Sequence, residues 1–171
     1  MFDQDIAKSK FDEGVSAFFK KNFEEAVSFF TEVIQHDSSS ALAYLSRGAA
    51  YTRMERPEDS IKDFNKAIEL KPDYARAYLL RGLEFEKKVD AEKALRDFDK
   101  AVELDPEYGA AYYSRAASHS KTGHEDLARE DIEMVTMLTE KNISEFANEN
   151  NIWRSHQLKL EAEDVADVMD R

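Results

Sequence analysis

The sequence predicts an all-α protein built from stacked helical hairpins. Composition gives the first indication, because 35% of the residues are charged while the chain holds only five glycines and three prolines. Such a composition favours helices with much solvated surface over a β fold, which needs many turns. A 34-residue internal repeat gives the second indication. At 171 residues, the chain has the length of one domain with a core of its own.

The repeat is visible in two pairs of segments. Residues 41–48 (ALAYLSRG) match residues 75–82 (ARAYLLRG), and residues 63–72 match residues 97–106. Repeats of 20–50 residues are typical of solenoids, in which each unit buries its apolar face against its neighbours. The period divides most of the chain into four units: 7–40, 41–74, 75–108 and 109–142.

Each unit is predicted to be a helix–turn–helix hairpin. A small residue recurs in the first helix: Gly14, Gly48, Gly82 and Ala116. A large apolar residue recurs sixteen positions later, in the second helix: Phe30, Phe64, Phe98 and Ile132. Glycine inside a helix costs about 1 kcal/mol relative to alanine, so its recurrence predicts a close approach of the second helix. Pro72 and Pro106 follow the expected ends of second helices.

This combination of small, aromatic and proline positions resembles the tetratricopeptide repeat family over residues 7–142. The resemblance implies four hairpins in a right-handed superhelix, whose first helices line a concave face. Units two and three match the family pattern closely. The outer units depart from it at these positions: Lys10, Ser38, Ala116, His119 and Glu140. Terminal repeats are usually atypical because they end the stack.

Residues 143–171 break the period. Asn142 with Glu145 three residues later predicts a helix start. Apolar residues then recur at helical spacing: Leu158, Ala162, Val165 and Met169. We expect one amphipathic helix, or two with a break near residues 148–151, that caps unit four. Docking in the protein's own groove and pairing with another subunit are the alternatives. Nine helices and no strand are expected in all.

Charged residues follow the same period. Arginine recurs at Arg47, Arg81 and Arg115, and aspartate recurs at Asp63, Asp97 and Asp131. Unit one lacks both at once, since Glu13 and Phe29 stand there. Paired presence and paired absence predict a partly buried arginine–carboxylate fork, with contacts within about 4 Å in at least two repeats.

The sequence offers no candidate residues for catalysis, a metal or a cofactor. Its histidines lack the spacing of zinc ligands on one helix: His36, His119, His124 and His156. No cysteine is present to supply a thiolate. A glycine-rich phosphate loop and a nucleophile elbow are also missing. We therefore expect a protein that is not an enzyme.

The charge balance restricts the class of partner. The 36 acidic and 24 basic residues give a net charge of −12, which disfavours nucleic acids and anionic membrane surfaces. No stretch approaches the roughly 18 apolar residues of a transmembrane helix. Asp3 and Asp5 stand where a secretory signal needs positive charge. A cytoplasmic protein is expected.

The resemblance also implies which residues face the concave groove. That groove is expected to be lined by Phe11, Val15, Phe18, Leu45, Ala49, Arg76, Leu79, Leu83 and Tyr113. An apolar lining suits an amphipathic helix or an apolar extended peptide. The net negative charge favours a partner segment that also carries basic residues.

The family's carboxylate clamp, which grips the C-terminal tails of heat-shock chaperones, is not matched. Of its five positions, only Arg76 keeps a base, and the others are Phe11, Val15, Ser46 and Leu80. The sequence thus predicts a non-catalytic protein-binding adaptor whose partner is not a chaperone tail. The alternatives are a dedicated chaperone for an apolar secretion client and a homo-oligomeric unit assembled through residues 143–171.

Overall fold

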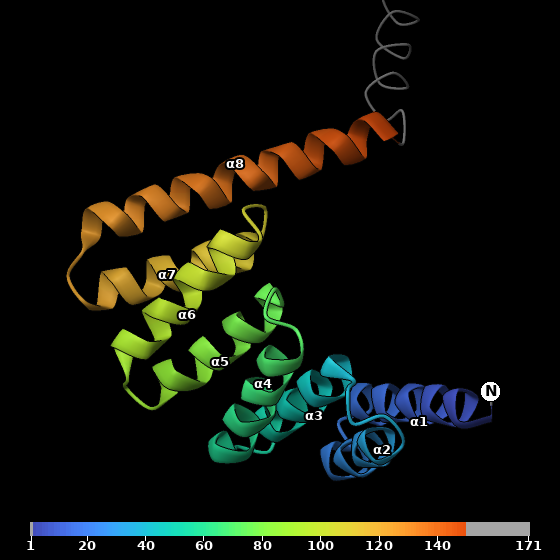
Figure 1. Cartoon of the computed structure of the whole chain (residues 1–171). Coiled ribbons are helices and arrows are strands. Elements are labelled where there is room, and N and C mark those ends of the chain that lie inside the picture. Colours follow the sequence, from blue (N-terminus) through green and yellow to red (C-terminus); the bar gives the residue numbers. More distant parts are fainter. Residues whose placement is uncertain (1, 150–171) are drawn as a thin grey trace, which may run out of the picture.

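The computed structural model describes residues 2–149, and the side chains of residues 6–145. This part of the chain forms eight helices and no strand, arranged along an arc (Figure 1). The helices are α1 (Phe2–Phe19), α2 (Phe23–His36), α3 (Ala41–Arg53), α4 (Pro57–Leu70), α5 (Ala75–Lys87), α6 (Ala91–Leu104), α7 (Gly109–Lys121) and α8 (Glu125–Glu149). The predicted all-α class is confirmed.

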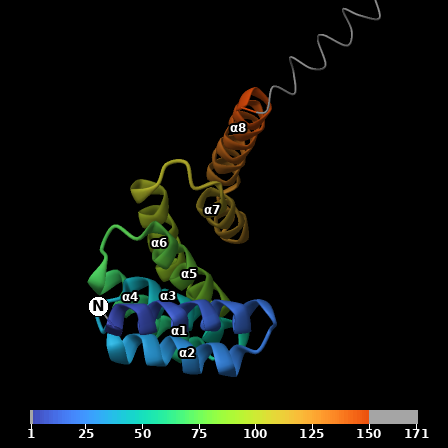
Figure 2. The ribbon, with the colours of Figure 1, turned by 90° about the vertical axis from the view of Figure 1, so that its right-hand side faces the viewer.

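Successive helices form four antiparallel hairpins that stack on one another (Figures 1 and 2). The second helix of each hairpin packs against the first helix of the next, as α2 does against α3. First helices also contact the next first helix along the stack, whereas no such contacts join the described second helices. The first helices therefore lie on the inner side of the arc.

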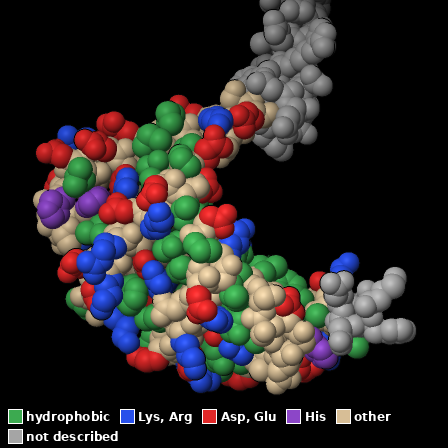
Figure 3. All heavy atoms as spheres, in the orientation of Figure 1, with side chains coloured by type: hydrophobic (Ala, Val, Ile, Leu, Met, Phe, Trp, Pro, Cys, Tyr) green, Lys and Arg blue, Asp and Glu red, His purple; other side chains and the backbone are tan. Residues whose placement is uncertain are grey.

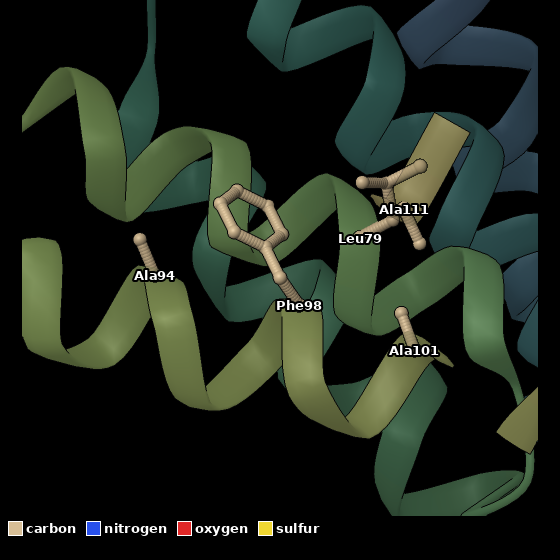
Figure 4. Close-up of a cluster of buried hydrophobic side chains, with 5 residues drawn as sticks. All are labelled: Leu79, Ala94, Phe98, Ala101 and Ala111. Atoms are coloured by element: carbon tan, nitrogen blue, oxygen red, sulfur yellow. The ribbon is translucent and has the colours of Figure 1, made fainter. Parts of the chain in front are cut away.

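The close approach predicted from the recurring glycines is present. A Cβ atom added to Gly14, Gly48 or Gly82 would lie 2.6–2.7 Å from Cε1 of the phenylalanine sixteen residues later. These phenylalanines are Phe30, Phe64 and Phe98, and each is at most 1% exposed. Figure 4 shows Phe98 among Leu79, Ala94, Ala101 and Ala111. The glycine removes the side chain that would otherwise occupy the space of the ring.

The turn inside each hairpin has a left-handed residue at the same repeat position. Their φ angles are 65° at Lys21, 57° at Glu55, 60° at Val89 and 80° at Gly123. In unit three, Val89 N–H donates to the Glu86 carbonyl and Asp90 N–H donates to the Phe85 carbonyl, each at 3.0 Å. This pair of bonds is a Schellman motif, which ends a helix with a residue in the left-handed conformation. Only unit four provides the glycine that this conformation favours.

Val89 is the least suitable of these turn residues, because a β-branched side chain is strained at positive φ. We expect Val89→Gly to raise the free energy of unfolding by about 1 kcal/mol. The side chain is 90% exposed, so little packing is lost. Urea titration followed by circular dichroism measures the change. Val89→Ala is the control. Its free energy of unfolding should rise much less, since alanine also disfavours this φ. A lower urea midpoint for Val89→Gly would contradict the expectation.

The predicted arginine forks occur in all three repeats. In unit two, Arg47 Nε and Nη2 each donate to one Asp63 carboxylate oxygen at 2.8 Å, and Nη1 donates to Thr31 Oγ1 of α2 at 3.1 Å. Hydrogen bonding to Asp63 raises the pKa of Arg47. The equivalent arginines are Arg81, bound to Asp97 and Asn65, and Arg115, bound to Asp131 and Asp99. Each arginine thus joins three helices from two successive hairpins.

The predicted helix start at Asn142 is wrong, because α8 continues through this position to Glu149. The physical reason is that no further hairpin follows α8 among the described residues. Helices α2, α4 and α6 end two residues before Ser38, Pro72 and Pro106, with or without a proline, and the next hairpin begins at residues 41, 75 and 109. The boundary drawn at residue 142 therefore falls inside a helix. The remainder of the predicted capping segment, residues 150–171, lies outside the described residues.

Candidate functional site

The described residues contain no group of three or more side chains suited to hold a metal ion. His119 and His124 flank the turn between α7 and α8, with ring centroids 6.0 Å apart. No helix in the described part of the chain is long and apolar enough to cross a membrane. The remaining candidates for a functional site in the described residues are surfaces that could bind another molecule.

An apolar hollow of about 290 Å³ lies between α1, α3 and the start of α5, at the N-terminal end of the arc. We call it the N-terminal hollow. Six of the nine predicted groove residues line it: Phe11, Val15, Phe18, Leu45, Ala49 and Arg76. Helical spacing on α1 brings the first three to one side of that helix. Leu45 is only 3% exposed and packs in the core beside Phe64, so it forms the floor of the hollow.

The other three predicted groove residues lie elsewhere. Leu79 is 5% exposed and belongs to the core cluster of Phe98, where Ala111 of the next hairpin packs with it (Figure 4). Leu83 packs against the same cluster. Tyr113 is 62% exposed and lines a different hollow, between α7 and α8. The nine predicted residues therefore do not line one groove, because Leu79 packs against Ala111 of unit four and Tyr113 faces the hollow between α7 and α8.

The structure adds residues that the sequence reasoning did not place in the groove. Phe19, the last residue of α1, is 79% exposed at the rim, and its ring centroid lies 6.3 Å from that of Phe18. Leu42 also lies on the lining and is 47% exposed. The adjacent pair Phe18 and Phe19 at the end of a helix was the signal available, since only one of two neighbours can face the core.

All five positions of the family's carboxylate clamp surround this hollow. They are Phe11, Val15, Ser46, Arg76 and Leu80. Three of these side chains are apolar, so the hollow has lost most of the donors that would bind a carboxylate terminus. Arg76 is the only charged residue on the lining. Among the described residues, no carboxylate forms an ion pair with it.

Arg76 also lies close to the phenols of the two tyrosines that precede α5 and α7. Burial raises the pKa of Tyr74 and of Tyr108, and the positive charge of Arg76 opposes that rise. Arg76 itself is exposed. Its guanidinium is therefore available to a bound molecule at the edge of the N-terminal hollow.

Comparison with known proteins agrees with this geometry. Residues 41–74 and 75–108 each match a family model described as the tetratricopeptide repeat. Residues 41–108 therefore belong to the tetratricopeptide repeat family. No curated protein sequence matches it.

Several solved structures share the fold. MamA is 22% identical with a TM-score of 0.75, and the match covers 81% of each chain. The TPR domain of Arabidopsis OM64 is 26% identical with a TM-score of 0.68, covering 70% of this chain and 98% of that one. The second TPR domain of human RPAP3, solved in complex with the HSP70 peptide SGPTIEEVD, is 27% identical with a TM-score of 0.65, covering 68% and 97%.

Proposed function

We propose that this protein is a non-catalytic adaptor that binds a peptide segment of a partner protein in the N-terminal hollow. The observation that carries the proposal is an apolar hollow on the inner side of a tetratricopeptide repeat stack, with Phe19 and Leu42 left exposed at its rim. Concave faces of repeat stacks commonly form binding surfaces. The peptide held by the second TPR domain of RPAP3 supports the same class of function.

The occupant is expected to insert one bulky apolar side chain. The lining presents rings and branched side chains, and Phe11 lies 5.5 Å from the buried Phe30 between ring centroids. Aromatic and aliphatic anchors in such hollows supply most of the binding free energy of a peptide. A volume of about 290 Å³ accommodates one such side chain with the adjoining backbone.

A carboxylate next to that anchor would pair with Arg76. An arginine without an acidic partner can form two parallel hydrogen bonds to a carboxylate, and these are among the stronger polar contacts in proteins. The basic residues expected from the net charge of −12 then lie outside the hollow, where they speed association at low salt. A chaperone tail with several carboxylates would leave most of them without donors against Phe11, Val15 and Leu80.

A peptide-display selection against the immobilised protein tests the proposal. Enriched sequences are expected to share one bulky apolar residue with Asp or Glu close beside it. Leu42→Glu and Arg76→Glu should each weaken the best peptide at least about tenfold, equivalent to about 1.4 kcal/mol, by fluorescence anisotropy. Leu42 lies in the first turn of α3, where an added glutamate is compatible with the helix.

Matched controls make the same charge change outside the hollow. Leu127→Glu alters a leucine of similar exposure on α8, and Lys62→Glu reverses an exposed base on α4. Both should bind the peptide as the unmodified protein does, and SGPTIEEVD should bind none of the proteins. Equal binding by Leu42→Glu would refute the hollow as the site. Enrichment of apolar peptides without an acid would favour a chaperone for an apolar client instead.

A further inference from the structure

A second hollow, of about 590 Å³, lies between the end of α3, the start of α4 and the end of α5. We call it the polar hollow, after its polar lining residues: Thr52, Arg53, Glu55, Glu84, Lys87 and Lys88. On α3, Thr52 lies one turn after Ala49, which lines the N-terminal hollow. On α5, Glu84 lies one turn after Leu80, which also lines that hollow. The two hollows are therefore adjacent along both helices.

Glu84 brings a charge to a buried position of the repeat. Its equivalents in the neighbouring units are Ala50 and Ser118, and all three residues are at most 2% exposed. Lys87 Nζ donates to Glu84 Oε1 at 2.9 Å, but the Lys87 side chain is itself 58% exposed. Burying a carboxylate costs free energy that an exposed partner offsets only in part. A costly residue that the equivalent positions do without is typical of a functional site.

Thr52 adds a hydroxyl without a partner to the same hollow. Its Oγ1 atom is buried and forms no hydrogen bond in the described part of the chain. Buried polar atoms nearly always have a partner, because leaving one without costs free energy. A bound group with several hydrogen-bond donors could serve both Thr52 and the Glu84 carboxylate.

The other bases on the lining already have partners of their own. Lys88 Nζ pairs with Glu58 of α4. The Arg53 guanidinium lies 5.5 Å from the ring centroid of Phe23 on α2. Basic and acidic side chains are interspersed over α5 and α6 (Figure 3), so the outer surface there does not select a ligand by charge. The buried carboxylate therefore decides the sign of the occupant, which is a cation.

An arginine side chain suits these acceptors better than Lys87 does. Its planar guanidinium forms two parallel hydrogen bonds to a carboxylate and keeps further N–H donors for a hydroxyl such as that of Thr52. The ammonium of a lysine is a single point charge on a flexible stem. Because Lys87 is largely exposed, its ammonium can return to water when an arginine replaces it at Glu84.

The distance between the hollows sets the spacing within the peptide. Arg76 and Glu84 lie about 12 Å apart along the axis of α5. An extended peptide covers this distance in about four residues. We propose that the polar hollow binds an arginine of the partner peptide, about four residues from the acid that pairs with Arg76. The inference rests on the proposed function, in which the N-terminal hollow holds the apolar anchor of the same peptide.

Repeating the peptide-display selection with Glu84→Ala as the target tests the inference. Peptides selected by the unmodified protein should carry an arginine about four residues from the acid. Glu84→Ala should still select the apolar residue with its acid, but not the arginine. Fluorescence anisotropy should show about tenfold weaker binding of the best arginine-bearing peptide to Glu84→Ala. Glu84→Gln, which keeps the size of the side chain, should behave in the same way. The same peptide with citrulline in place of arginine should bind all three proteins equally.

Glu86→Ala is the matched control. It removes the same charge from α5 outside the polar hollow, where Glu86 pairs with Lys121, and it should bind the arginine peptide as the unmodified protein does. Lys87→Met removes the competing ammonium and keeps the aliphatic stem, so it should bind that peptide more tightly. Circular dichroism checks that each variant keeps its helices.

Three results would overturn the inference and leave the proposed function intact. The first is arginine enrichment that persists with Glu84→Ala and Glu84→Gln. The second is weaker binding of the arginine peptide by folded Lys87→Met, which would assign the hollow to an acid. The third is a selection by the unmodified protein that yields the apolar residue and its acid without arginine. A selection without the apolar residue and its acid would refute the proposed function and the inference together.

Discussion

Gly82→Leu is expected to lower the free energy of unfolding by about 3 kcal/mol. A Cβ atom at Gly82 would lie 2.6 Å from Cε1 of Phe98 and 3.2 Å from Cβ of Asp97. Phe98 is fully buried and packs with Ala94 and Ala101, so its ring has no free space to enter. Removing a glycine from a helix gains about 1 kcal/mol, which does not offset the overlap. Urea unfolding measures the loss.

Two comparisons isolate the cause. Gly109→Ala should leave the free energy of unfolding unchanged, because the nearest atom to its added Cβ is Leu138 Cδ1 at 4.0 Å. Gly82→Ala should cost less in a Phe98→Ile background, which copies the pair Ala116 and Ile132 of unit four. An equal cost of Gly82→Ala in both backgrounds would show that the ring is not the obstacle.

Asp97→Ala should lower the free energy of unfolding by about 3 kcal/mol, because it leaves the largely buried Arg81 guanidinium without its carboxylate partner. Arg81 Nε and Nη2 donate to the two Asp97 oxygens at 2.8 and 2.7 Å, and the Arg81 side chain is 19% exposed. Arg81→Leu combined with Asp97→Ala should recover part of this loss, since the double variant leaves no unpaired charge. The double-mutant cycle is expected to give a coupling of about 2 kcal/mol.

The exposed pair Lys100–Glu103 provides the control, with Nζ and Oε1 also 2.8 Å apart. Its side chains are 37% and 69% exposed, so its coupling should stay below about 1 kcal/mol. If the two pairs couple equally, burial adds nothing to the fork. In that case the recurrence of arginine and aspartate would reflect surface charge alone.

The contacts that the sequence predicted are those within one repeated unit. The glycine–phenylalanine pairs and the three arginine forks each join residues sixteen positions apart in the same hairpin. Repetition made them visible, because the same pair recurs wherever both members are present. The third bond of each fork escaped prediction. Its acceptors on the preceding hairpin, Thr31, Asn65 and Asp99, share no chemical type by which to recognise them.

The helix ends were predictable only where a residue stops the helix. Pro72 and Pro106 follow α4 and α6 closely, as expected. The conformation of the hairpin turns was harder to predict from the sequence, since Lys21, Glu55 and Val89 adopt a left-handed conformation that their side chains do not favour. Packing of the two helices imposes that turn, so tertiary contacts outweigh local preference there. At Asn142 a local capping signal failed, because no further hairpin packs against α8 at that point among the described residues.

The sequence by itself determined the class of fold and the recurrence of a helical hairpin, and its family resemblance implied the inner position of the first helices. Only the tertiary structure decided which inner residues remain available to a partner. Leu45, Leu79 and Tyr113 occupy the same repeat position, but Leu45 and Leu79 are 3% and 5% exposed, whereas Tyr113 in the last described hairpin is 62% exposed. The physical reason is that a residue's access to a partner depends on its neighbouring hairpins. Identical repeat positions therefore differ in exposure wherever those neighbours differ.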